Sequence, residues 1–177
     1  LANYLQGQGE QVLDRVNNIL GEMHRLQEQI GVSAVPGTNN SILDRRDKLL
    51  TDLSTLIEVQ ISYGDMGEAT VTLGNAPGGP VLLDENGPAR VTMNSDLSLV
   101  VRPALAASSP DETLTRAATG GRLHGLSSAY SAVMSTLTDL SNWAMTVTEQ
   151  MNTVHMDSRD AEGNPGERLF SLNGWTT

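Results

Sequence analysis

The feature that most constrains the fold is an unbroken helical spacing of apolar residues in the second half of the chain. Ten residues recur at intervals of alternately three and four, the period of one apolar face on an α-helix. They are Leu123, Leu126, Tyr130, Val133, Leu137, Leu140, Ala144, Val147, Met151 and Val154. At 1.5 Å per residue, a helix from the first to the last is about 48 Å long. Since a lone helix cannot bury such a face, we expect it to pack against other helices.

A second apolar face of the same period runs through the N-terminal residues. Its members are Leu5, Val12, Val16, Ile19, Met23, Leu26 and Ile30, flanked by Leu13 and Leu20. The segment Val35-Pro36-Gly37 breaks this helix, and a shorter amphipathic helix is expected over residues 41–57. The short break predicts an antiparallel hairpin. We expect Val133, Leu137 and Leu140 of the long helix to pack against the stretch Val16–Leu26.

Between residues 58 and 102 the apolar period changes to two, which is typical of β-strands. The alternating runs are Val59–Tyr63, Ala69–Leu73, Val81–Leu83, Arg90–Met93 and Leu97–Val101, with turns rich in Gly, Asn, Asp and Pro between them. We expect four or five short antiparallel strands. A piece this small buries little apolar surface alone, so the strands should rest on the helices.

These patterns predict an α+β fold, an elongated antiparallel helical bundle of two long helices and one shorter helix with a small inserted antiparallel β subdomain. The expected divisions are a helical hairpin (1–57), the β insert (58–102), an exposed connector rich in Ser, Ala and Thr (103–120), the long helix that completes the bundle (121–155) and a tail packing on the bundle (156–177). The chain starts at Leu1, already inside an apolar repeat. We therefore expect it to be a piece of a longer protein.

Composition excludes several classes of function. The 177 residues contain no cysteine, which excludes a disulfide framework, a thiol nucleophile and cysteine-ligated metal sites. The 21 acidic and 11 basic residues give a net charge of −10, and no run of basic residues occurs. Nucleic acids and anionic lipids are bound through clustered Lys and Arg. No apolar run approaches the roughly 20 residues that a membrane span requires. We expect neither a nucleic acid nor a membrane as partner.

The sequence offers little catalytic chemistry. His24, His124 and His155 lack the spacing of metal ligands, and no G-x-S-x-G nucleophile turn occurs. The glycine-rich stretch 119–125 lacks the P-loop pattern and is typical of a plain helix start. We predict no catalytic, cofactor-binding or metal-binding residue. The acidic cluster of residues 157–164 departs from the calcium-loop pattern because Arg159 occupies a ligand position. A turn is favoured there, and a weak cation site is the alternative.

Two surfaces are candidates for contact with neighbouring subunits. The outward face of the long helix is small, polar and nearly uncharged, whereas solvated helix faces are usually rich in Lys, Glu and Arg. It carries Ser127, Ser128, Ser131, Ser135, Thr136, Thr138, Ser141, Asn142, Thr146 and Thr148. This composition indicates either drift in an acidic protein or a subunit interface that includes Ser131 and Thr138. On the shorter helix, Asp44, Arg45, Arg46 and Asp47 could make intersubunit ion pairs. Pairs within the helix are the alternative.

Several motifs, in chain order from about residue 10 to 172, resemble those of the bacterial flagellar hook-associated protein 1 family, the first hook–filament junction proteins. Residues 40–54 resemble the family's N-D-L-L-D-Q-R-D-Q-L-L-x-E-L-S segment, and residues 120–126 its G-G-x-L-x-G-L helix start. Asn152–His155 and Asp160–Phe170 resemble its N-x-x-H and D-x-x-G-x-x-G-x-x-L-F motifs. Asp157 stands where the family often has glycine.

The resemblance implies a rod-like helical core domain with a β insert, without the terminal helices by which the family's axial proteins polymerise. It implies a structural adapter rather than an enzyme, with no cofactor, exported by the flagellar type III apparatus to the extracellular flagellum. Expected partners are the hook protein, the second junction protein and copies of the chain. This piece alone is expected to be monomeric. The alternatives are another secreted or phage-tail helical rod protein, and an acidic binding protein or enzyme.

Overall fold

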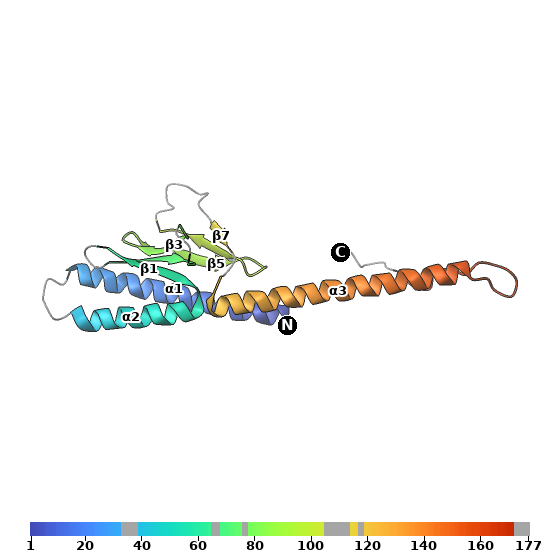
Figure 1. Cartoon of the computed structure of the whole chain (residues 1–177), viewed down its shortest axis with the longest axis horizontal. Coiled ribbons are helices and arrows are strands. Elements are labelled where there is room, and N and C mark those ends of the chain that lie inside the picture. The colour runs from blue at the N-terminus through green and yellow to red at the C-terminus, as the bar shows by residue number, and fades with distance from the viewer. Residues whose placement is uncertain (33–38, 65–67, 76–77, 105–113, 117–118, 172–177) are drawn as a thin grey trace. The chain divides into compact units, whose positions relative to one another are not determined.

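The computed structural model describes residues 1–32, 39–64, 68–75, 78–104, 114–116 and 119–171 (Figure 1). The chain divides into two compact units, unit 1 (Leu1–Ser131) and unit 2 (Ala132–Thr177). The long helix α3 (Gly121–Asp157) begins in unit 1 and continues into unit 2. Among the described residues there are two long helices, one shorter helix and short antiparallel strands, which confirms the predicted α+β class.

Unit 1 is organised around helix α1 (Ala2–Val32), which packs against α2 (Asn39–Leu56) and against the strands. The predicted apolar face of α1 is buried from Leu5 to Leu26, with every member at most 9% exposed. On α2 the buried apolar residues are Leu49, Leu50 and Leu53, and the buried Ile57 follows directly after the helix. Packing of these faces holds α1 together despite the glycines at positions 7, 9 and 21, each of which lowers helix stability by roughly 1 kcal/mol relative to alanine.

The strands form two small antiparallel sheets. The first has the order β1-β2-β3-β4 and the second β5-β6-β7. Their bounds are β1 (Val59–Tyr63), β2 (Ala69–Leu73), β3 (Val81–Asp84), β4 (Gly87–Pro88), β5 (Arg90–Met93), β6 (Leu99–Arg102) and β7 (Leu114–Arg116). Inward residues of β2, β3, β5 and β6 join the core that α1 and α2 provide. As expected, the strands rest on the helices.

Two strands were not predicted. Strand β4 is only two residues long, too short to show a period. Strand β7 lies inside the stretch 103–120 that we expected to be an exposed connector, and it pairs with β6 in the register Val100↔Thr115. Three residues are too few to show an alternating apolar pattern that would indicate a strand. They form strand β7 because their backbone pairs with the edge of β6.

Three polar side chains of α1 connect the helix to the strand region and were also missed. The Asn17 side chain donates from Nδ2 to the Val91 carbonyl (2.8 Å) and accepts from the Val91 N–H at Oδ1 (2.9 Å). Gln27 Nε2 donates to the Ala69 carbonyl (3.0 Å), and Gln6 Nε2 donates to the Ser95 carbonyl (2.8 Å). Backbone groups at sheet edges need partners when water is excluded, and α1 supplies them.

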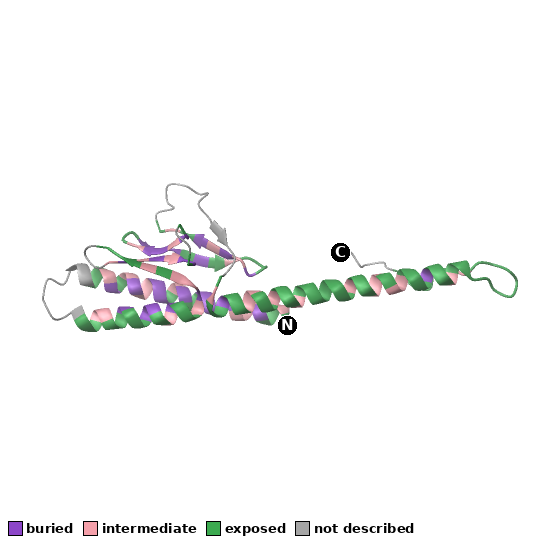
Figure 2. Ribbon diagram, viewed as in Figure 1, coloured by how far each residue is buried: buried purple, intermediate pink, exposed green. Residues whose placement is uncertain are grey.

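The apolar face of α3 is buried at its start and exposed farther on. Leu123 is fully buried in the core of unit 1, whereas Leu137 and Leu140 are 50% and 58% exposed. Figure 2 shows that most of α3 is coloured as exposed. The prediction that Val133, Leu137 and Leu140 pack against Val16–Leu26 is therefore wrong for the two leucines, and Val133 is only half-buried. The physical reason is that α2 and the strands already cover the Val16–Leu26 face inside unit 1.

Within the described part of the chain, no helix is both long enough and apolar enough to span a membrane.

Candidate functional site

The glycine motif at residues 120–126 fixes the start of α3 against the end of α2. Gly121 has a φ of +71°, and a Cβ built on it would lie 2.6 Å from the carbonyl carbon and oxygen of Leu56. Two residues later Leu123 enters the core, and Arg122 Nη2 donates to Gln8 Oε1 (3.0 Å). A side chain at residue 121 would prevent this close approach, so the motif has a packing role.

In unit 2, the Asn152 side chain holds the returning tail against α3. Asn152 is 1% exposed, and its Oδ1 accepts from the N–H groups of Leu169 and Phe170, both at 2.9 Å. Its Nδ2 donates to the Phe170 carbonyl (3.0 Å). One amide group thus pairs three backbone groups of the tail, a function for which asparagine supplies both donor and acceptor.

The remaining contacts of the tail surround this clamp. His155 Nδ1 lies 2.7 Å from the Glu167 carbonyl, which makes Nδ1 the protonated nitrogen. The Gly166 N–H donates to the Ser158 carbonyl (3.0 Å), and a Cβ on Gly166 would lie 2.2 Å from the His155 carbonyl oxygen. Arg168 Nη2 pairs with Glu149 Oε2 (3.1 Å). The N-x-x-H motif therefore binds the G-x-x-L-F part of the tail.

Asp160 organises the turn between α3 and the tail. Its Oδ1 accepts from the N–H groups of Glu162 (3.0 Å) and Asn164 (2.8 Å), and its Oδ2 accepts from Asn164 Nδ2 (3.0 Å). These bonds, the Asn164 side-chain bond foremost, hold the pKa of Asp160 below its usual value. Among the described residues, no group of three His, Cys, Asp or Glu side chains could hold a metal ion. The carboxylate binds the turn itself.

We expect this turn to loosen in acid. A carboxyl whose pKa is lowered by folding stabilises the fold above its unfolded pKa of about 3.9, and that contribution is lost as pH falls through the lower folded value. An NMR titration of the Asn164 side-chain amide should therefore show a transition below pH 3.9. The transition should be absent in Asp160→Asn. A midpoint at or above 3.9 in the unmodified chain would show that the turn does not depend on this carboxylate.

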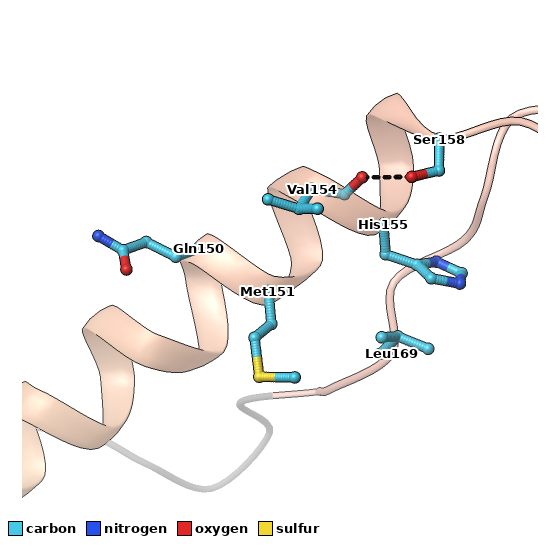
Figure 3. Close-up of a pocket in the computed structure, with 6 residues that line it drawn as sticks. All are labelled: Gln150, Met151, Val154, His155, Ser158 and Leu169. Carbon is cyan, nitrogen blue, oxygen red and sulfur yellow. Dashed lines mark hydrogen bonds between the residues drawn. The ribbon is translucent and has the colours of Figure 1, made fainter.

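An apolar surface occupies one face of α3 in unit 2. We define the α3 stripe as Leu137, Leu140, Ala144, Val147, Met151 and Val154. Met151 is 47% and Val154 69% exposed, and Ala144 and Val147 are half-buried. At its C-terminal end the stripe borders a recess of about 340 Å³, lined by Gln150, Met151, Val154, His155, Ser158 and Leu169. Figure 3 shows Met151 extending from the helix toward the returning tail, which carries Leu169.

Most of the Ser/Thr-rich face of α3 is exposed, including Ser131 and Thr138, whereas Ser127, Ser141 and Thr148 are half-buried. Its hydroxyls largely bond to the helix itself: Thr138 Oγ1 donates to the Met134 carbonyl (2.9 Å) and Ser141 Oγ to the Leu137 carbonyl (2.9 Å). The same bond four residues back is made by Thr136, Thr146 and Thr148. These hydroxyl protons are already bonded to carbonyl oxygens of α3. A neighbouring subunit that covers this face would therefore not have to supply acceptors for them.

The four charged candidates of α2 divide into exposed and buried members. Arg45 pairs with Glu22 of α1, and Asp44 and Asp47 are exposed. Arg46 is 8% exposed, with its guanidinium 4.8 Å from the centre of the Tyr63 ring and Nη2 3.3 Å from Asp47 Oδ1. Arg46 thus joins α2 to β1 inside unit 1 and is not available to a neighbouring subunit. Pattern reasoning could not find the Tyr63 partner, which is 17 residues away along the chain.

Comparison with known proteins places these motifs in context. The profile described as the flagellar hook-associated protein FlgK helical domain matches residues 1–170. The chain is 29% identical to flagellar hook-associated protein 1 of Escherichia coli (strain K12) over 189 residues, which cover 96% of the chain and 33% of that protein. It is 26% identical to the protein of the same name from Bacillus subtilis (strain 168), covering 94% of the chain and 37% of the relative.

A solved structure shares the fold. The flagellar hook junction protein FlgK from Burkholderia pseudomallei superposes with a TM-score of 0.78 at 24% identity, covering 96% of this chain and 31% of that one. The chain thus spans about a third of the length of the relatives it matches.

Proposed function

The chain belongs to the family of the flagellar hook-associated protein FlgK helical domain, and from this premise we propose that it is a structural subunit of the bacterial flagellum. In this proposal it acts as an adapter at the hook–filament junction, through packing between subunits and without catalysis. The match over residues 1–170 is the observation that carries the proposal. The relatives named above are flagellar hook-associated proteins, which favours this function over a phage-tail component.

The proposal includes a location and partners. The subunit is exported through the flagellar type III apparatus and works outside the cell, between the hook protein and the second junction protein and beside copies of itself. The absence of cysteine is compatible with export in an unfolded state, because no disulfide can form on the way.

Two surfaces supply the proposed subunit contacts. Ser131 and Thr138 lie on the uncharged face of α3, where small side chains let another backbone approach closely. The exposed charges Asp44, Arg45 and Asp47 of α2 offer ion pairs, which are worth little individually at a surface and act mainly in orienting a neighbour.

Deletion of the gene in its bacterium tests the function. Electron microscopy should show hooks without filaments, and the unmodified gene supplied in trans should restore filaments. Normal filaments in the deletion strain would contradict the proposal.

The same strain tests the proposed face of α3. The double variant Ser131→Glu/Thr138→Glu should restore fewer filaments, because an interface that buries two carboxylates must desolvate them. Its thermal stability should change by no more than about 0.5 kcal/mol, since both positions are exposed. Asn18→Glu, an exposed polar position on α1, is the control and should restore filaments fully. Full restoration by the double variant would remove this face from the assembly.

A further inference from the structure

We propose that Asn86 is a site of spontaneous modification in the folded chain. Its side-chain amide reacts with the backbone nitrogen of Gly87, ammonia leaves, and the turn between β3 and β4 loosens. The inference goes beyond the proposed function, because it concerns a chemical change that the chain undergoes with water alone. The observation that leads to it is an exposed asparagine followed by glycine at the edge of the first sheet, where β4 pairs through two residues.

The first argument concerns which asparagines of the chain can react in this way. A backbone nitrogen reaches a neighbouring side chain most readily when its own residue has no side chain, and only Asn86 and Asn173 precede a glycine in the sequence. Asn173 lies outside the described residues. Asn94, in the turn after β5, is exposed too but precedes a serine. Asn164 precedes a proline, whose nitrogen carries no hydrogen and cannot form the ring.

The second argument is the weak pairing around the turn. Asn86 is exposed between Asp84 and Gly87, which face each other in the β3–β4 pair. Strand β4 consists of two residues, and one of them, Pro88, has no N–H to donate. Segments with few backbone hydrogen bonds open at a lower free energy than core strands do. The turn can therefore bring the Gly87 nitrogen to the Asn86 side chain while the core stays folded.

The reaction needs no reagent other than water. The Gly87 nitrogen gives up its proton and forms a bond to the side-chain Cγ of Asn86. The bond from Cγ to Nδ2 breaks, and Nδ2 leaves with that proton as ammonia. Water then opens the five-membered imide at either of its two carbonyl carbons, which leaves aspartate or isoaspartate at position 86. No atom is oxidised or reduced.

The third argument is what the product does to the turn. The Asn86 N–H donates to Asp84 Oδ1 (2.9 Å) and Asn86 Nδ2 donates to Asp84 Oδ2 (3.2 Å). Deamidation replaces the second donor by a carboxylate, so that positions 84–86 carry three negative charges in succession and repel one another.

Isoaspartate adds a change in the main chain, which becomes longer by one methylene before Gly87. Gly87 is buried with a φ of +126°, and a Cβ built on it would lie 3.5 Å from the Ala104 Cβ. A displaced Gly87 therefore meets a packed neighbour, and both products weaken the pairing of β4 with β3.

Incubation of the purified chain at 37 °C, followed by peptide mapping with mass spectrometry, tests the modification. The peptide that contains Asn86 should gain the mass that distinguishes a carboxyl from an amide and should separate into two chromatographic forms. Conversion at Asn86 should be roughly tenfold faster than at Asn94, because glycine leaves the attacking nitrogen unhindered. Conversion at Asn173 shows that the conditions permit the reaction. Asn86→Gln keeps the amide but would require a larger ring, so position 86 should then stay unmodified.

An Asn86 that stays intact while Asn173 converts would show that the folded turn protects it, and would overturn the proposal. Equal conversion at Asn86 and Asn94 would also overturn it, because the glycine and the short strand would then make no difference.

Hydrogen exchange at Ala89 tests the effect on the turn, since the Ala89 N–H donates to the Leu82 carbonyl (2.8 Å) directly after β4. Asn86→Asp reproduces one product and should accelerate this exchange about fivefold, as loss of one hydrogen bond predicts. The converted chain should show the same acceleration. Asn94→Asp adds the same charge to another exposed turn of unit 1 and is the matched control, with unchanged exchange at Ala89. Unchanged exchange in Asn86→Asp and in the converted chain would overturn the loosening of the turn.

Discussion

Replacing Gly121 by alanine is expected to lower the free energy of unfolding of unit 1 by about 3 kcal/mol. The φ of +71° is strained for alanine, which costs roughly 1–2 kcal/mol. The added Cβ would also lie 2.6 Å from backbone atoms of Leu56, which cannot move aside as a flexible side chain could. Forcing α3 away from α2 further loosens Leu123, which is fully buried. Urea unfolding followed by circular dichroism measures the change.

Gly125→Ala is the matched control for this prediction. Gly125 lies four residues later in the same helix, and a Cβ there meets nothing within 4 Å. Alanine is the better helix former by roughly 1 kcal/mol, so this variant should be slightly more stable than the unmodified chain. If both variants shifted stability in the same direction and by similar amounts, the close approach of Gly121 to α2 would not be what holds the start of α3.

Asn152→Ala is expected to release the tail from α3 while leaving the helix formed. The substitution removes the acceptor of the Leu169 and Phe170 N–H groups and the donor to the Phe170 carbonyl. At about 1 kcal/mol net for each hydrogen bond, the local clamp weakens by about 2–3 kcal/mol. Hydrogen exchange at the amides of Leu169 and Phe170 should therefore accelerate roughly 30- to 150-fold.

Thr153→Ala controls for this second prediction. Thr153 is the next residue, is exposed, and its hydroxyl donates only to the Glu149 carbonyl within the helix (2.9 Å). Exchange at Leu169 and Phe170 should be unchanged in that variant. Slow exchange that persists in Asn152→Ala would indicate that His155 and Arg168 suffice to hold the tail.

The candidate site could be predicted from the sequence only as a motif. Asn152 and His155 stand out as the N-x-x-H pair, but nothing in their spacing says that they bind the backbone of residues 167–170. That contact depends on the reversal at Asp160, which brings residues 18 positions apart together. The same limit applies to Arg46 and Tyr63, because local periodicity carries no information about which distant ring a guanidinium meets.

The sequence by itself determined the apolar faces of α1 and α2 and the longer strands, because helical and extended periods each place every apolar residue on one side of an element. Tertiary structure decided which surface covers each face. Strands β4 and β7 form because their backbones pair with β3 and β6. Asn17 of α1 bonds to Val91 because the tertiary structure places β5 beside α1. The stripe from Leu137 to Val154 has the same period as the buried face of α1, yet it is exposed. An apolar period indicates that one face of a helix needs a packing partner. Only the tertiary structure shows that the apolar face of α1 is already covered by α2 and the strands.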